Sequence, residues 1–221
     1  MKLRGAVFDM DGTLFDTERI YREIWVELGR QYGKELGDDF IRNVTGTGGE
    51  EMYRILEAYL DVPDGSVVEK EWQKRSVERT RYDVPLKPGT RELLEWMSQH
   101  GYVMAVASSS PMPWIIHYLD VTDTAQYFRA VISGREIPNG KPAPDIFLRA
   151  CAELGAEPQE CWVFEDSKNG AAAGHAAGCR TVLIPDLVQP EEETRKICEV
   201  YDSFMDVLAL LRQEEAEWKQ C

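Results

Sequence analysis

The sequence predicts an α/β fold: a doubly wound, mostly parallel sheet with a small helical domain inserted near its start. After residue 89, short apolar strands alternate with amphipathic helices, a pattern typical of parallel sheets that are covered on both faces. One strand precedes residue 9, whereas residues 17–83 show helical spacing and no convincing strand. We therefore expect a core domain of residues 1–16 and 84–221 and a helical domain of residues 17–83.

The expected strands are short and continuously apolar, at residues 5–8, 103–107, 130–132, 161–164 and 181–184. The core helices are expected after an N-cap at Thr90 and at residues 111–119, 144–154, 169–177 and 204–211. We expect the charged tail, residues 213–221, to fray. In the inserted segment, the apolar spacing predicts helices that end near Gly33, before Pro63 and near Tyr82.

Charge and cysteine content limit the partners and the compartment. The 221 residues include 25 Lys and Arg against 39 Asp and Glu, a formal net charge of -14, which disfavours nucleic acid and anionic membranes. No apolar stretch is long enough to span a bilayer. The five cysteines form no CxxC pair, and their odd number without a signal peptide favours free thiols in a reducing cytoplasm. We expect a cytoplasmic monomer.

Chemically active side chains follow the strands. Parallel sheets bind ligands beyond the carboxyl ends of their strands, so residues that follow different strands meet at one edge. The residues that follow the expected strands are Asp9 and Asp11, Ser108 to Ser110, Lys141, and Glu165 with Asp166. Carboxylates, a hydroxyl and a lysine together suit phosphoryl transfer through an aspartyl-phosphate.

Four stretches resemble, in order, the motifs of the haloacid dehalogenase superfamily. They are Asp9-Met10-Asp11-Gly12-Thr13, Ala107-Ser108-Ser109, Gly140-Lys141-Pro142-Ala143-Pro144-Asp145 and Phe164-Glu165-Asp166-Ser167. The resemblance spans about residues 5–185, and the insertion point of a helical cap agrees with it. It implies a magnesium-dependent phosphatase that acts on a small phosphorylated metabolite, either a sugar phosphate or a nucleoside monophosphate.

The side chains that follow the strands and the resemblance to the family together imply a role for each residue. Asp9 would attack phosphorus, and Asp11 would protonate the leaving oxygen and later deprotonate water. Asp9, Asp166 and the backbone carbonyl of Asp11 would hold Mg²⁺, with Glu165 bound directly or through water. The residues expected to bind phosphate or substrate are Gly12, Thr13, Ser108, Ser109, Lys141 and Glu18.

Plainer interpretations stand beside these roles. Asp, Gly and Thr also cluster after strands because they form turns. Lys141 could be an exposed loop lysine, and Glu165 could shape the surroundings of the site without binding metal. The choice of Ser108 among three serines depends on its position directly after the strand. Glu18 could simply belong to a helix cap.

Two other functions compete with the phosphatase. A sugar phosphomutase of the β-phosphoglucomutase type would use the same aspartyl-phosphate, but this chain has Thr13 where mutases of the family carry Val or Ile. Its cap loop, residues 44–49, contains no Lys or Arg, and Tyr21 stands where the mutases place a histidine. The basic residues between Lys70 and Arg81 are interpreted as a solvated helix face. A non-catalytic protein would be expected to lack Asp9, Asp11 or Lys141.

Overall fold

The computed structural model describes residues 4–45, 47–186 and 189–218. The chain divides into two compact units, Met1–Asp16 with Pro85–Cys221 (the core unit) and Thr17–Val84 (the helical unit). The helical unit thus ends one residue later than the expected boundary, and the side chain of Val84 is buried. Among the described residues, no helix combines the length and apolar character needed to cross a bilayer.

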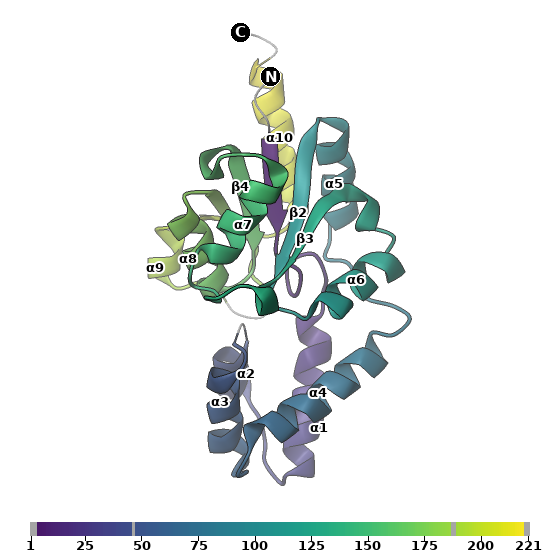
Figure 1. The fold of residues 1–221 in the computed structure, drawn as a ribbon, viewed down its shortest axis with the longest axis vertical. Helices are drawn as coiled ribbons and strands as arrows, with labels where there is room; N and C mark the ends of the chain where they lie inside the picture. Colours follow the sequence, from purple (N-terminus) through teal and green to yellow (C-terminus); the bar gives the residue numbers. More distant parts are fainter. Residues whose placement is uncertain (1–3, 46, 187–188, 219–221) are drawn as a thin grey trace. The chain divides into compact units, whose positions relative to one another are not determined.

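A parallel sheet of six strands forms the centre of the core unit, within the described residues (Figure 1). The strands run in the order β3-β2-β1-β4-β5-β6, and every pairing is parallel. Their bounds are β1 Arg4–Phe8, β2 Tyr102–Ser108, β3 Phe128–Ser133, β4 Cys161–Glu165, β5 Arg180–Leu183 and β6 Glu199–Val200. The strand order reverses at β1, so the doubly wound fold is confirmed and the loops after β1 and β4 lie side by side.

Helices cover both faces of this sheet (Figure 1). On one face, α7 (Asp145–Leu154) packs on β1, β2 and β3, and α8 (Lys168–Ala177) packs on β4 and β5. On the other face lie α5 (Thr90–Gln99) and α10 (Phe204–Trp218), which contact each other. Alternation along the strands separates the two cores: Val7 and Val163 face α7, whereas the ring centroids of Phe8 and Phe164 lie 6.1 and 5.8 Å from that of Phe204.

Smaller elements complete the core unit. Helix α6 (Met112–Val121) packs against β3, and a short helix α9 (Glu192–Arg195) packs against α8. Among the described residues of this unit, 3₁₀ turns cover Ala125–Tyr127, Gly134–Glu136 and Pro158–Glu160. Neither α9 nor β6 was predicted from the sequence, and β6 is only two residues long.

Two local predictions were wrong. The N-cap of α5 is Gly89, and Thr90 is the first helical residue, because its hydroxyl donates to the Leu14 carbonyl at 3.1 Å. The expected fraying of residues 213–221 is contradicted as far as Trp218, to which α10 extends; residues 219–221 lie outside the described residues. Glu214 accepts a hydrogen bond from Arg180 at 3.0 Å, and Glu215 lies 3.4 Å from His100, which anchors this part of the helix.

The helical unit contains α1 (Glu18–Gln31), α2 (Asp38–Val44), α3 (Glu50–Leu60) and α4 (Gly65–Arg79). The sequence analysis anticipated all of these except α2. The core of the unit is aromatic: the Trp25 and Trp72 rings stack 5.0 Å apart, and the Phe40 ring packs edge-on against Trp25 at 5.5 Å. Phe40, on α2, is completely buried.

The two arginines of α4 are paired with carboxylates of the same unit. Arg79 pairs with Glu23 at 3.2 Å and with Glu27 at 2.5 Å. Arg75 pairs with Glu71 at 2.9 Å and donates to the Gln31 side chain at 2.7 Å. These half-exposed pairs support the interpretation of this helix surface as a solvated, charge-balanced face.

We expect Phe204→Ala to lower the free energy of unfolding by about 3–5 kcal/mol, because the cavity would open under the Phe8 and Phe164 rings. The matched control is Met205→Ala at the neighbouring residue, which is 46% exposed and should lose less than about 1 kcal/mol. Urea denaturation of both variants measures the difference. Equal losses would show that α10 does not depend on this aromatic contact.

Candidate active site

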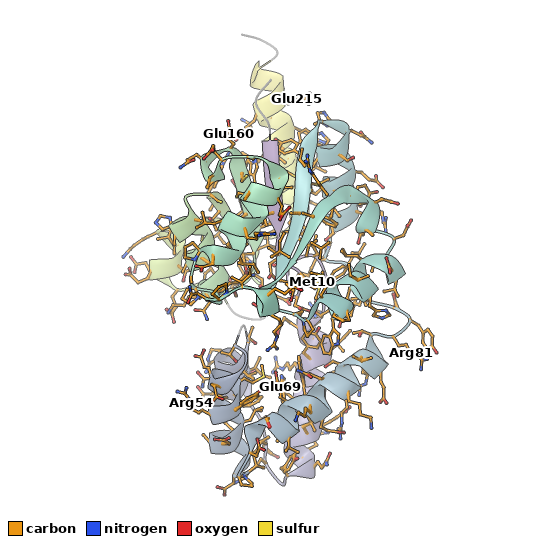
Figure 2. The ribbon with its side chains drawn as sticks, in the orientation of Figure 1. Met10, Arg54, Glu69, Arg81, Glu160 and Glu215 are labelled. Atoms are coloured by element: carbon orange, nitrogen blue, oxygen red, sulfur yellow. The ribbon has the colours of Figure 1, made fainter. Side chains whose placement is uncertain are left out.

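The turn after β1 places two aspartates at the carboxyl edge of the sheet. The Asp9 backbone N–H donates to the Phe164 carbonyl at 2.9 Å, which extends the pairing with β4 by one residue. The Met10 carbonyl accepts from the N–H groups of Leu14 and Phe15, and Met10 lies at this end of β1 in Figure 2. Gly12 has a φ of +75°, a conformation that an L side chain rarely adopts. This closed turn fixes the positions of the carboxylates.

Lys141 links the carboxylates of two neighbouring strands. Its Nζ donates to Asp9 Oδ1 at 2.5 Å and to Glu165 Oε1 at 2.5 Å, and also to the Ala107 carbonyl at 3.3 Å. The lysine side chain is only 6% exposed, so these interactions are strong and shielded from solvent. Nζ also lies 5.0 Å from the centre of the Phe147 ring on α7. The structure therefore contradicts the alternative of an exposed loop lysine.

One lysine does not balance the negative charge at this edge. Ligand oxygens of Asp9, Glu165 and Asp166 all lie within 4.8 Å of one another. Burial raises the pKa of Asp9 to about 8, opposed by Lys141 and reinforced by the charge of Glu165. Burial would lower the pKa of Lys141, but the charges of Asp9 and Glu165 outweigh it and raise that pKa. A hard divalent cation would favour the ionised form of Asp9 in this setting, and oxygen donors suit such a cation.

Glu165 is the most constrained carboxylate of the group. It is 1% exposed, and its Oε2 accepts from the backbone N–H of Asp166 at 3.1 Å and from the N–H and hydroxyl of Ser167 at 3.3 and 3.0 Å. A methyl group added at Gly170, in the first turn of α8, would lie 1.9 Å from the Glu165 carboxyl carbon. Gly170 thus leaves room for this carboxylate beneath the start of the helix.

Asp11 is held by a serine that the sequence analysis did not select. The Ser110 hydroxyl donates to Asp11 Oδ2 at 2.7 Å, and the Ser110 carbonyl accepts from the Ser133 hydroxyl at 2.7 Å. Ser108 is 2% exposed, and its hydroxyl accepts from the Ser110 N–H at 3.1 Å, whereas Ser109 is exposed. Only the run of three serines could have indicated Ser110, because its contact with Asp11 joins residues 99 positions apart.

A family comparison agrees with this geometry. The model of the haloacid dehalogenase-like hydrolase family matches residues 6–184. The chain belongs to the haloacid dehalogenase-like hydrolases. This range contains Asp9, Asp11, Ser108, Lys141 and Glu165, so the family match covers the whole cluster at the sheet edge.

Known relatives of this hydrolase cover most of its length. The "Phosphorylated carbohydrates phosphatase" of Thermotoga maritima is 33% identical over 184 residues, which is 81% of this chain and 84% of that protein. The structure of CbbY from Rhodobacter sphaeroides in complex with phosphate is 26% identical, with a TM-score of 0.77 over 91% of this chain and 95% of that one. β-Phosphoglucomutase from Clostridium difficile shares the fold, with a TM-score of 0.76 at 21% identity over 99% of this chain and 100% of that one.

The remaining expected site residues of this hydrolase lie in different surroundings. Thr13 is completely buried, and its hydroxyl has no hydrogen-bond partner among the described residues. Glu18 belongs to the helical unit, where it begins α1 and its carboxylate accepts from the Thr45 hydroxyl at 3.5 Å. Asp166, by contrast, lies at the sheet edge with the Asp9 and Glu165 carboxylates.

We expect Gly170→Ala to destabilise the protein by about 1–3 kcal/mol, because the new methyl group would displace the Glu165 carboxylate. The control is Gly140→Ala, where an added methyl group meets nothing within 4 Å and the effect should stay within about 1 kcal/mol. Thermal unfolding of both variants provides the comparison. A Gly170→Ala variant as stable as the parent would show that Glu165 is free to move.

Proposed function

We propose that this hydrolase is a magnesium-dependent phosphatase that hydrolyses a small phosphorylated metabolite through an aspartyl-phosphate on Asp9. The observation that carries the proposal is the Asp9 carboxylate, which contacts Lys141 and lies within 4.8 Å of Glu165 and Asp166, with Asp11 two residues away. A buried carboxylate that contacts a lysine and further carboxylates fits a nucleophile better than a turn residue.

In the proposed first step, an Asp9 oxygen attacks phosphorus and the bond to the leaving oxygen breaks. The proton on Asp11 passes to that oxygen, so the product leaves as an alcohol. In the second step, Asp11 takes a proton from water as the water oxygen attacks the same phosphorus. The bond to Asp9 then breaks, which releases inorganic phosphate and restores the Asp9 carboxylate and the protonated Asp11.

Other residues of the site orient and stabilise the reacting groups. Lys141 neutralises charge on Asp9 and on the phosphoryl oxygens, and Ser108 and Ser109 bind those oxygens through O–H or N–H groups. The Ser110 hydroxyl keeps Asp11 in one orientation. Gly12 permits the close turn that brings Asp11 to the phosphate, and Thr13 supports this turn from within the core.

The donor set fits magnesium. Asp9, Asp166 and the Asp11 carbonyl would hold the ion, with Glu165 beside them directly or through water, and all of these donors are oxygens. When bound, the ion supplies positive charge that offsets the excess of carboxylates and stabilises the developing charge on phosphate. The negative charge that Lys141 leaves uncompensated is the reason why we expect a cation at this site.

Hydrolysis is favoured over a phosphomutase reaction. A mutase has to retain a bisphosphorylated intermediate, which requires cations for a second phosphate. Arg75 and Arg79 of α4 are already paired with carboxylates of their own unit. The loop of residues 44–49 contains no basic residue, although Gly46 lies outside the described residues. Likeness to the C. difficile mutase, at 21% identity, concerns the fold alone.

The proposal also covers the class of substrate, the oligomeric state and the cellular compartment. The name of the T. maritima relative, at 33% identity, supports a sugar phosphate, and a nucleoside monophosphate is the alternative. The helical unit would act as a cap that selects the substrate, with Glu18 as one contact. We expect the enzyme to act as a monomer in the cytoplasm, and its net charge of -14 disfavours nucleic acid and membrane partners.

The deciding experiment measures phosphate release from a panel of sugar phosphates and nucleoside monophosphates with Mg²⁺ and after chelation. We expect turnover only with the ion, and less than about a hundredth of it in Asp9→Asn, because the amide is nearly isosteric but is not a nucleophile. Circular dichroism of the variant should match the parent. Turnover that survives exhaustive chelation, or an active Asp9→Asn variant, would contradict the proposal.

The same assay separates the two enzyme classes. β-Glucose 1-phosphate is offered with a trace of glucose 1,6-bisphosphate, and both glucose 6-phosphate and free phosphate are followed. We expect free phosphate to form faster, because the helical unit keeps Arg75 and Arg79 paired. Faster formation of glucose 6-phosphate would make the chain a mutase.

We expect Ser110→Ala to lower kcat roughly ten- to a hundredfold with little change in KM, because Asp11 loses the hydrogen bond that orients it. Ser98→Ala is the control, since Ser98 is an exposed serine of α5 with no part in the proposed reaction, and its kcat and KM should stay as in the parent. Steady-state kinetics on the best substrate of the panel measures both. If KM rises in Ser110→Ala while kcat is unchanged, Ser110 binds substrate and does not position Asp11.

A further inference from the structure

Three buried thiols lie together in the core unit, apart from the groups used in the proposed reaction. Cys151 lies on α7, Cys161 begins β4, and Cys179 precedes β5, and they are 1%, 1% and 9% exposed. The Sγ atoms of Cys151 and Cys179 are 3.7 Å apart, although 28 residues separate them in sequence. All three belong to the apolar cluster beneath α7.

Cys151 is the central member of this group. The Cys161 and Cys179 thiols lower the pKa of Cys151, and the same interactions raise the pKa values of Cys161 and Cys179. In the 3.7 Å contact between Cys151 and Cys179 either thiol can donate, and donation to Cys151 stabilises its thiolate, which is the nucleophilic form. Cys198 differs: it is half-buried, and its thiol donates to the Thr194 carbonyl at 3.2 Å.

The thiols lie at the opposite end of the strands from the carboxylates. Cys161 begins β4 and Glu165 ends it. Glu160, next to Cys161, and Met10, next to Asp9, mark these two ends of the sheet in Figure 2. The group therefore has no part in binding substrate, and any influence on the site has to pass through an element that reaches both ends.

We propose that Cys151 and Cys179 are a modification site for hydroperoxides, at which a reversible disulfide forms and lowers turnover. The second clause rests on the proposed phosphatase function, whereas the first does not. A reducing compartment would keep the pair as thiols until peroxide appears.

The chemistry uses one peroxide and both thiols. The Cys151 thiolate attacks a peroxide oxygen, the O–O bond breaks, and Cys151 becomes a sulfenic acid. The alkoxide or hydroxide that leaves takes up the proton that the Cys151 thiol released and departs as an alcohol or water. The Cys179 sulfur then attacks the Cys151 sulfur, and the S–O bond breaks. The hydroxide that leaves takes the Cys179 proton and becomes water. Two thiols lose two electrons, and the peroxide gains them.

Helix α7 connects this pair to the active site. Bond formation brings the two sulfurs from 3.7 Å to about 2 Å, and a close-packed core transmits such a shift. One turn before Cys151, α7 carries Phe147, whose ring lies 5.0 Å from Lys141 Nζ. Lys141 in turn contacts Asp9 and Glu165. Displacements of about 1 Å in a catalytic group can lower turnover a hundredfold, so we expect at least a tenfold loss.

The test treats the folded, reduced protein with stoichiometric hydrogen peroxide, blocks remaining thiols by alkylation and maps the peptides by mass spectrometry. Digestion combines trypsin with a glutamate-specific protease, because cleavage after Glu153 or Glu160 separates Cys151 from Cys161. We expect a linked Cys151–Cys179 peptide that a dithiol reductant removes, and phosphate release that falls at least tenfold and recovers with the reductant.

Two variants serve as matched controls. Cys179→Ser should keep its turnover after peroxide, whereas Cys198→Ser should lose it as the parent does. The proposal is overturned if Cys151 and Cys179 stay alkylatable while Cys198 is oxidised, or if the linked peptide forms without loss of turnover. The mapping needs no activity, so an inactive parent enzyme would refute the phosphatase function and leave the disulfide to be judged separately. If Cys179→Ser fails to fold, peptide mapping of the parent protein still tests whether the disulfide between Cys151 and Cys179 forms.

Discussion

The contact of Lys141 with Asp9 and Glu165 is the interaction on which the rest of this structure depends. The lysine side chain is 6% exposed and the two carboxyl groups 10% and 1%, so three ionisable groups have left water together. Removing one partner from such a group leaves an uncompensated buried charge, which typically costs about 3–5 kcal/mol. The contact also joins three elements, the turn after β1, the loop before α7 and the end of β4, and thereby sets the distance between Asp9 and the carboxylates that follow β4.

The strand order explains why these elements meet. β1 lies between β2 and β4, and the direction of winding reverses there, so the ends of β1 and β4 face one crevice. Side-chain alternation then directs the odd-numbered residues of β1 and β4 toward α7 and α8. Val7 and Val163 fill the apolar core on this face, and Asp9 and Glu165 continue the same rows at the edge. The alternation that places apolar side chains in the core therefore continues at the edge of the sheet with the charged side chains of the site.

The arrangement of the site residues along the strands also explains which features could be predicted from the sequence. The sheet and the residues that follow its strands could be predicted, because a buried strand has a local apolar pattern in the sequence. Parallel sheets bind ligands beyond the carboxyl ends of their strands, and this rule predicts that the residues after the strands lie together. Ser110 could not be predicted, since its contact with Asp11 is specified only by the fold. Helix α2, seven residues long, depends on the burial of Phe40 against Trp25 rather than on strong periodicity. The last part of α10 is held by the ion pair between Arg180 and Glu214, a long-range contact that no local sequence pattern predicts.

Both connections to the helical unit are fixed on their core side. Phe15 and Leu86 form an isolated bridge, the Asp16 N–H donates to the Pro85 carbonyl at 2.8 Å, and the Lys87 N–H donates to the Leu14 carbonyl at 2.9 Å. The Lys87 side chain adds a buried ion pair with Asp186, after β5, at 2.7 Å. The turn that carries Asp11 is thus bonded to the returning chain. Any reorientation of the helical unit would have to occur beyond Asp16 and Pro85, and the hydrogen bonds of the turn that carries Asp11 would persist through it.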